Sequence, residues 1–139
     1  MVDKSGSVPV QIEHLLGIVR RLRDPDQGCP WDVGQTFQSI VPHTIEEAYE
    51  LADAIESNDF DQIREEAGDV LFQVLFYAQM ADEKQHFNFA DVVDGLSEKL
   101  IRRHPHVFSR NSTAQQETPI AVSDVSDSWE KIKRTERQG

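Results

Sequence analysis

The chain has little of several things that other classes of protein need. Its one cysteine, Cys29, can form no internal disulfide and has no Cys-x-x-Cys partner, which is typical of a reducing compartment. Its densest apolar run, residues 70–81, is too short to cross a membrane and contains two glutamines. The N-terminus has no apolar signal core. We therefore expect a soluble, cytoplasmic protein with no membrane partner.

Positive charge is also scarce. Lys and Arg total 14 against 25 Asp and Glu, so the net charge is −11. This balance argues against a protein that binds a nucleic-acid polymer through its general electrostatic surface. An anionic ligand would need either a bridging metal ion or a local basic patch.

No strand pattern of convincing length is present, whereas apolar residues recur at steps of three and four. The sequence predicts a first helix over residues 9–23 and an ordered loop over 24–35. A second helix is expected to carry Pro42 in its first turn and to end near residue 57. A third, capped by Asp59 or Asp61, is expected over about 60–85, and a fourth from Asn88 to about His104, where Pro105 stops it.

The expected organisation is one all-α domain over residues 1–139. An antiparallel bundle of four main helices forms its helical core over 8–108. Residues 109–126, rich in Ser, Thr and Gln, are predicted to be a mobile linker, and 127–137 a short C-terminal helix. Because residues 70–81 are apolar on nearly every side, they should be enclosed by other helices or by a partner subunit.

Two acidic runs repeat one spacing. Glu46-Glu47-x-x-Glu50 lies on the second predicted helix, and Glu66-x-x-Asp69 follows on the third after fifteen intervening residues. Residues three apart on a helix are neighbours, and a short connection makes the two helices antiparallel neighbours, so the acids should face each other. Such close like charges repel one another, and a hard divalent cation with oxygen ligands relieves that repulsion.

A solvated surface, a di-iron site and a zinc site are the alternatives to a hard-cation site for these acids. A lone Glu-x-x-Glu is usually a solvated helix face, but two pairs on adjacent helices make that alternative weaker. A di-iron site needs two Glu-x-x-His segments, and only Glu83-x-x-His86 fits. Zinc would need His and Cys ligands at regular spacing, which are not found. Oxygen ligands alone favour Mg²⁺, with Mn²⁺ as a substitute, and such sites commonly serve phosphate chemistry.

A small basic cluster and a few aromatic residues are the remaining candidates for substrate contacts. Lys99, Arg102 and Arg103 gather at the end of the fourth predicted helix, where they either bind phosphates or complement the helix dipole. Trp31 and Trp129 either stack on a base or serve core packing. The residues alone leave both alternatives open.

Several motifs together resemble the MazG family of nucleoside triphosphate pyrophosphohydrolases, within an all-α group that includes dimeric dUTPases. The resemblance covers about residues 12–137. Besides the two acidic runs, it is carried by Leu22-Arg23-Asp24-Pro25, Gly28-Cys29-Pro30-Trp31-Asp32, Gln35-Thr36, Leu71-Phe72-Gln73-Val74 and Arg102-Arg103-His104-Pro105-His106-Val107-Phe108.

The resemblance implies a helical unit, completed by dimerisation, that hydrolyses a nucleoside triphosphate to the monophosphate and pyrophosphate with Mg²⁺. A dimer or a dimer of dimers is expected. Glu46 would orient or deprotonate the attacking water. The implied metal ligands are Glu47, Glu50, Glu66 and Asp69. The implied substrate contacts are Lys99, Arg102, Arg103, Trp129 and Lys133, to which we add Trp31.

Many members of this family carry two copies of the unit, and those copies need not both be active. The alternative function is therefore a catalytically weak or inactive nucleotide-binding or regulatory module that corresponds to the first copy. A third hypothesis is a plain helical interaction domain, in which the acids form only a solvated face.

Overall fold

The computed structural model describes residues 7–109 and 121–138, and every regular element within these two stretches is a helix. The prediction of an all-α fold is confirmed. None of the helices in the described stretches has the length and apolarity needed to span a membrane. Internal contacts divide the chain into two compact units, residues 1–89 and 90–139.

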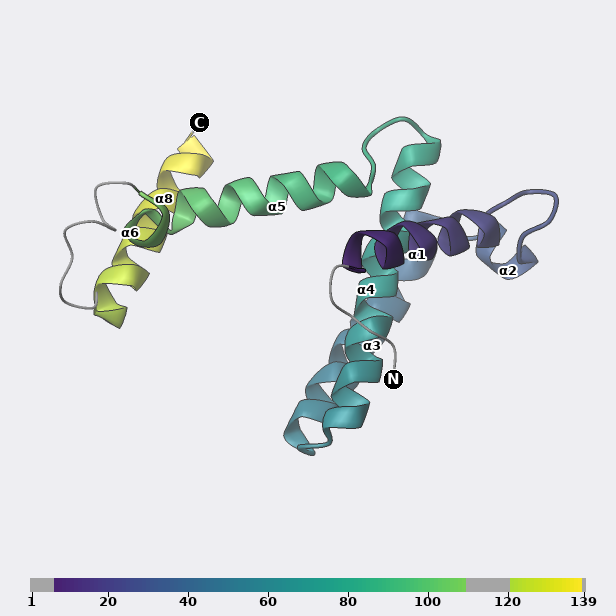
Figure 1. Ribbon diagram of the computed structural model, residues 1–139, viewed down its shortest axis with the longest axis horizontal. Coiled ribbons are helices and arrows are strands. Elements are labelled where there is room, and N and C mark those ends of the chain that lie inside the picture. Colours follow the sequence, from purple (N-terminus) through teal and green to yellow (C-terminus); the bar gives the residue numbers. More distant parts are fainter. Residues whose placement is uncertain (1–6, 110–120, 139) are drawn as a thin grey trace. The chain divides into compact units, whose positions relative to one another are not determined.

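Helices α1 to α4 form the first unit, in which α3 and α4 run side by side as an antiparallel hairpin (Figure 1). The helix α1 packs against α4. The bounds are Val8–Leu22 for α1, Pro30–Val33 for α2, Phe37–Glu56 for α3 and Phe60–Glu83 for α4. The predicted loop over residues 24–35 thus contains one short helix, α2, that the sequence pattern did not indicate.

The start of α3 corrects a prediction. Thr36 accepts a hydrogen bond from the backbone N–H of Ser39, and the Ser39 hydroxyl accepts one from the backbone N–H of Thr36, which together form a capping box. Pro42 therefore lies inside the helix and not in its first turn. The additional residues bring Ile40 into the core, where it is 3% exposed. Burial of Ile40 and the capping box offset the backbone hydrogen bond that Pro42 cannot donate.

The helix α4 begins where the sequence predicts, because the Asp59 carboxylate accepts a hydrogen bond from the backbone N–H of Gln62 at 3.2 Å. Its second half supplies most of the core, as expected from the apolar run. However, Leu71 and Val74 remain 43% and 38% exposed. The core cluster consists of Val19, Ile40, Leu75, Phe76 and Met80.

Arg23, at the end of α1, holds the loop over residues 24–36 and also binds α4. Its guanidinium donates hydrogen bonds to the backbone carbonyls of Asp32, Val33 and Gln35. It also forms an ion pair with Glu83 at 2.6 Å, near the end of α4. Since the Arg23 side chain is only 11% exposed, this set of bonds is largely shielded from water. The loop that carries α2 is consequently held in one position.

The second unit contains α5 (Phe89–Arg103), α6 (Pro105–Phe108) and α8 (Val122–Gln138). Pro105 ends α5 as predicted but also opens the one-turn helix α6. The prediction of a short C-terminal helix over 127–137 is wrong at its start, because α8 begins at Val122. The Ser- and Asp-rich composition of 122–128 favoured a linker, yet these residues continue the helix. Residues 110–120 of the predicted linker lie outside the described residues.

Candidate metal centre

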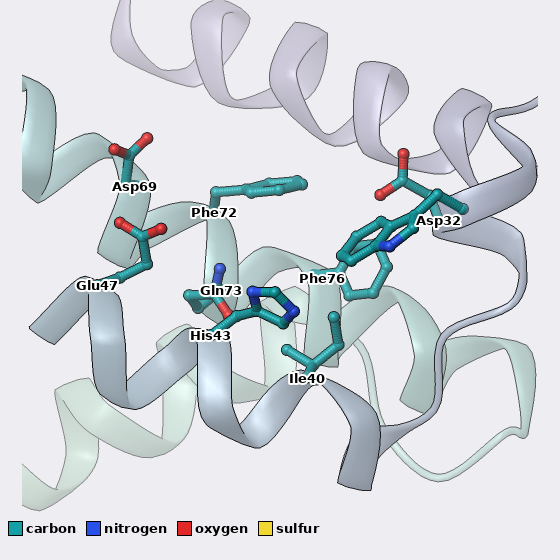
Figure 2. Close-up of a pocket in the computed structure, with 9 residues that line it drawn as sticks. Asp32, Ile40, His43, Glu47, Asp69, Phe72, Gln73 and Phe76 are labelled. Atoms are coloured by element: carbon teal, nitrogen blue, oxygen red, sulfur yellow. The ribbon is translucent and has the colours of Figure 1, made fainter.

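Three of the predicted metal ligands lie together across the α3–α4 hairpin. One carboxylate oxygen each from Glu47, Glu66 and Asp69 lies within 4.8 Å of the other two. Figure 2 shows Glu47 on α3 and Asp69 on α4 turned toward each other. The antiparallel pairing of the two helices produces this arrangement, since each acidic run faces the other helix. We call these three residues the carboxylate cluster.

The carboxylate cluster is partly shielded from water and has no ion-pair partner in the part of the chain that the structure describes. Oε2 of Glu47 and Oε2 of Glu66 are buried and have no hydrogen-bond partner among the described residues. Burial raises the pKa of Glu47 above its ordinary value, and the charges of Glu50 and Asp69 raise it further. Burial and the same two charges also raise the pKa of Glu66. An unpaired buried carboxylate oxygen is costly, and a bound cation would remove that cost.

Glu50 belongs to the same electrostatic group, because its charge acts on both Glu47 and Glu66. Glu46 does not lie in the carboxylate cluster. It lines an adjacent open groove on α3, together with Glu50, Ile45 and Tyr49. The structure thus brings Glu47, Glu50, Glu66 and Asp69 together and leaves Glu46 exposed beside them.

The donors in this cluster fit a hard cation. All of them are carboxylate oxygens, which Mg²⁺ and Mn²⁺ accept and which zinc or iron sites usually supplement with nitrogen or sulfur. The two orphaned buried oxygens are the observation that supports the fit. Among the residues that the structure describes, no other group of three potential ligands has this geometry.

A pocket of about 290 Å³ adjoins the carboxylate cluster. Glu47 and Asp69 lie at one side of it and Asp32 at the other, with Phe72 and Phe76 between them (Figure 2). The other lining residues are Trp31, Ile40, His43 and Gln73. The ring of Trp31 meets His43 edge to face at a centroid distance of 5.4 Å. Of the predicted substrate contacts, Trp31 is the one that this pocket contains.

Sequence reasoning missed Asp32, His43 and Gln73 as site residues. Asp32 and Gln73 are both 8% exposed, which is unusual for polar side chains. The signal for Gln73 was present, since it interrupts an otherwise apolar run on α4. Asp32 stood out only as part of the motif over residues 28–32 and His43 gave no signal, because the pocket that they line forms only when the loop carrying α2 packs beside α3.

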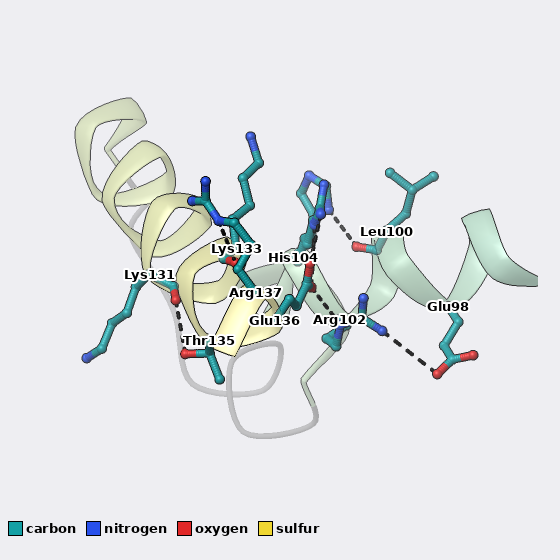
Figure 3. Close-up of polar contacts among 10 residues, drawn as sticks. Glu98, Leu100, Arg102, His104, Lys131, Lys133, Thr135, Glu136 and Arg137 are labelled. Carbon is teal, nitrogen blue, oxygen red and sulfur yellow. Dashed lines mark hydrogen bonds and ion pairs between the residues drawn. The ribbon is translucent and has the colours of Figure 1, made fainter. Parts of the chain in front are cut away.

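The remaining predicted substrate contacts, Lys99, Arg102, Arg103, Trp129 and Lys133, lie in the second unit. Arg102 of α5 binds Glu136 of α8 at 2.8 Å (Figure 3). Arg103 binds the same carboxylate group, also at 2.8 Å. These hydrogen bonds lower the pKa of Glu136 to about 2. Both arginines are thus already paired with a carboxylate.

Trp129 packs edge to face on His104 at a centroid distance of 5.0 Å, and its indole N–H is buried without a partner among the described residues. Lys133, on the same helix, is half-buried. Lys99 is exposed on α5.

The first unit is thus an all-helical hairpin that brings facing Glu and Asp side chains together beside a pocket. The model of the MazG nucleotide pyrophosphohydrolase domain matches residues 35–108, which include both acidic runs. The chain belongs to this family, and the predicted resemblance is confirmed.

Two curated relatives match most of this chain, but the match covers only part of their own length. The chain is 54% identical to a nucleoside triphosphate pyrophosphohydrolase of Escherichia coli (strain K12) over 127 residues, 91% of this chain and 46% of the relative. It is 52% identical to a nucleoside triphosphate pyrophosphohydrolase/pyrophosphatase MazG of Thermotoga maritima over 99 residues, 71% of this chain and 38% of that relative. The chain therefore spans about half the length, or less, of these relatives.

A solved structure of matching size supports the fold. The crystal structure of a mazG-related protein from Thermotoga maritima is similar with a TM-score of 0.67 and 27% sequence identity. The similarity covers 88% of this chain and 98% of that one.

Proposed function

We propose that this chain hydrolyses nucleoside triphosphates to nucleoside monophosphate and pyrophosphate with Mg²⁺. The observation that carries the proposal is the carboxylate cluster with its two orphaned buried oxygens, next to a pocket. The family and the names of the relatives from E. coli and T. maritima support it.

In this proposal Glu47, Glu50, Glu66 and Asp69 hold the cation. When bound, Mg²⁺ supplies positive charge that offsets the charge on the triphosphate oxygens, and Mn²⁺ would serve in its place. The four carboxylates come from two packed helices, so their positions are fixed before substrate arrives. Their own negative charge keeps the triphosphate from binding when no cation is present.

One further acid, Glu46, is proposed to activate the attacking water molecule. Glu46 is exposed next to Glu50, where it is free to orient a water molecule and accept its proton. The water oxygen forms a new bond to phosphorus, the anhydride bond between the α and β phosphates breaks, and pyrophosphate leaves. The role of Glu46 rests on the family motif.

The pocket beside the cluster suits the base. Its volume of about 290 Å³ is at the lower end of the range for small-molecule sites, which fits a base and not a whole nucleotide. Trp31 supplies an aromatic surface there. Arg102 and Arg103, with Lys99, Trp129 and Lys133, are proposed to contact the phosphates or the nucleoside, and Glu136 must release the arginines for that.

We also assign a homodimer, or a dimer of dimers, to the active form. Apolar side chains remain exposed on both helices of the hairpin, among them Tyr49 at 72% and Ile45 at 52%. Apolar surface of this kind is typical of an interface. Sedimentation of the purified protein tests the assignment, and a monomer at micromolar concentration would contradict it.

The test of the activity is pyrophosphate release from each of the eight common ribo- and deoxyribonucleoside triphosphates. Glu50→Gln and Asp69→Asn should each lower turnover by roughly 100-fold or more. Loss of a group that only hydrogen-bonds to a metal ligand already lowers metal affinity or activity by about 10–100-fold, and these variants lose a ligand itself. Glu65→Gln, an exposed neighbour of Glu66, is the matched control and should keep full turnover. Full activity in both site variants would contradict the assignment.

A second candidate function is a module that binds nucleotide without cutting it. The pairing of Arg102 and Arg103 with Glu136 favours this candidate, since it occupies groups that a phosphate would need. Binding of a triphosphate without release of pyrophosphate in the same assay would support it.

A further inference from the structure

Gln73 is a buried polar side chain in the wall of the pocket. It is 8% exposed and lies on α4 one turn after Asp69, so it faces the same cavity as the carboxylate cluster. The residues around it on α4 are mainly apolar. A glutamine in such a place needs hydrogen-bond partners for both ends of its amide.

One end of the amide is held by a chain of hydroxyl groups. Thr44 Oγ1, on α3, donates a hydrogen bond to Gln73 Oε1 at 2.9 Å. The same hydroxyl lies 2.7 Å from the Tyr77 hydroxyl. Thr44 Oγ1, which also lies 3.3 Å from the Ile40 carbonyl oxygen, thus orients the amide with its own carbonyl oxygen toward α3.

The other end of the amide has no partner. Within residues 7–109 and 121–138 no group accepts a hydrogen bond from Gln73 Nε2. Figure 2 shows this nitrogen turned toward the pocket. The pocket therefore offers a hydrogen-bond donor beside the aromatic surfaces of Trp31, Phe72 and Phe76.

We infer that Gln73 determines base specificity by donating a hydrogen bond to an exocyclic oxygen of the base. This inference rests on the proposed function, which places the base in the pocket. Hypoxanthine, guanine, uracil and thymine carry an oxo group that accepts this bond. Adenine and cytosine carry an amino group at the corresponding position, which sets a donor against a donor and leaves Gln73 Nε2 unpaired.

The experiment compares substrates that differ mainly in this group, ITP with ATP and UTP with CTP. For each, kcat/KM for pyrophosphate release is measured on the full chain with Mg²⁺. The wild-type protein should favour the oxo member of each pair about tenfold, as expected for one neutral hydrogen bond. Equal values, or preference for ATP and CTP, would overturn the inference.

Variants separate the role of Gln73 from a merely structural one. Gln73→Met keeps the side-chain volume and removes the hydrogen-bond donor, so the ratio of kcat/KM values within each pair of substrates should fall to near one. Thr44→Val should do the same with Gln73 intact, because the amide is then free to turn over. Thr44→Ser keeps the hydroxyl and should keep the preference. Unchanged preference in Gln73→Met and Thr44→Val would overturn the inference.

A separate measurement of nucleotide binding distinguishes failure of this inference from failure of the proposed activity. The intrinsic fluorescence of the unsubstituted chain, whose two tryptophans are Trp31 and Trp129, reports binding of the same four nucleotides with Mg²⁺. If no nucleotide is hydrolysed, the activity fails while tighter binding of ITP and UTP still supports Gln73. Hydrolysis of all four with equal affinities contradicts the inference and leaves the activity intact.

Discussion

At the scale of single residues, Glu47 and Glu66 determine how the carboxylate cluster responds to protons and to metal. Each has a raised pKa because burial and neighbouring negative charges disfavour its ionised form. A raised pKa in the folded state means that the fold binds more protons than the unfolded chain between the two pKa values. The contribution of these residues to stability is therefore full below their unfolded pKa, and it declines as the pH rises through the folded pKa.

Glu66→Gln should remove the contribution of Glu66 to this pH dependence in the metal-free protein. In EDTA at neutral pH, the variant should melt at a higher temperature than the wild type, because it no longer carries a repelled, partly buried charge. Below the ordinary pKa of a glutamate the two should melt alike, because Glu66 is then protonated in both the folded and the unfolded chain. Thermal unfolding from that acidic range up to neutral pH measures the difference between the two proteins.

Glu65→Gln is the control for the same series, because Glu65 is exposed on the same turn of α4. It should follow the wild type at every pH. A metal-free Glu66→Gln variant that melts below the wild type at neutral pH would mean that Glu66 has a stabilising partner, which contradicts the electrostatic account.

At the scale of the elements, Arg23 holds α2 and its flanking loop against α1 and α4. Arg23→Gln should lower the free energy of unfolding by about 2–3 kcal/mol, because backbone carbonyls and Glu83 lose a largely buried donor. Chemical denaturation monitored by circular dichroism measures this loss. Arg23→Lys should restore only part of it, since an ammonium group lacks the fork that reaches both sides.

The same substitution should be visible at Trp31, which lies on α2. Trp31 is 52% exposed, and loss of the Arg23 bonds frees the loop that carries it, so the fluorescence anisotropy of Trp31 in a Trp129→Phe background should fall. Arg64→Gln is a suitable control because Arg64 is exposed on α4 and pairs only with Asp61 at 3.6 Å among the described residues. If Arg23→Gln behaves like Arg64→Gln in both measurements, the loop is held by other contacts.

At the scale of the whole molecule, the sequence predicts those features that follow from local periodicity, namely the main helices and the position of the acidic residues on them. Apolar steps of three and four located the main helices. The acidic spacing located the carboxylate cluster, because two helices with a short connection must face each other. The start of α3 was mispredicted because Pro42 is a common first-turn residue, and because the capping box of Thr36 has Ser39 in place of the usual Glu or Gln.

Features that join distant parts of the chain could not be predicted in this way. Arg23 and Glu83 are sixty residues apart, and the bonds between Thr44 and Gln73 span twenty-nine. No local pattern carries such pairings, since each follows from how the helices pack. The polar wall of the pocket, and with it the inference on base specificity, therefore required the structure.

The most direct test of the central claim is a calorimetric titration of the metal-free protein with Mg²⁺ alone. The account predicts saturable binding of Mg²⁺. Glu66→Gln should abolish this binding or weaken it at least about tenfold, because it removes a charged metal ligand. Glu65→Gln should bind as the wild type does. Equal binding by wild type and Glu66→Gln, or no binding by the wild type at millimolar Mg²⁺, would contradict the claim that the facing acids of α3 and α4 form a metal centre.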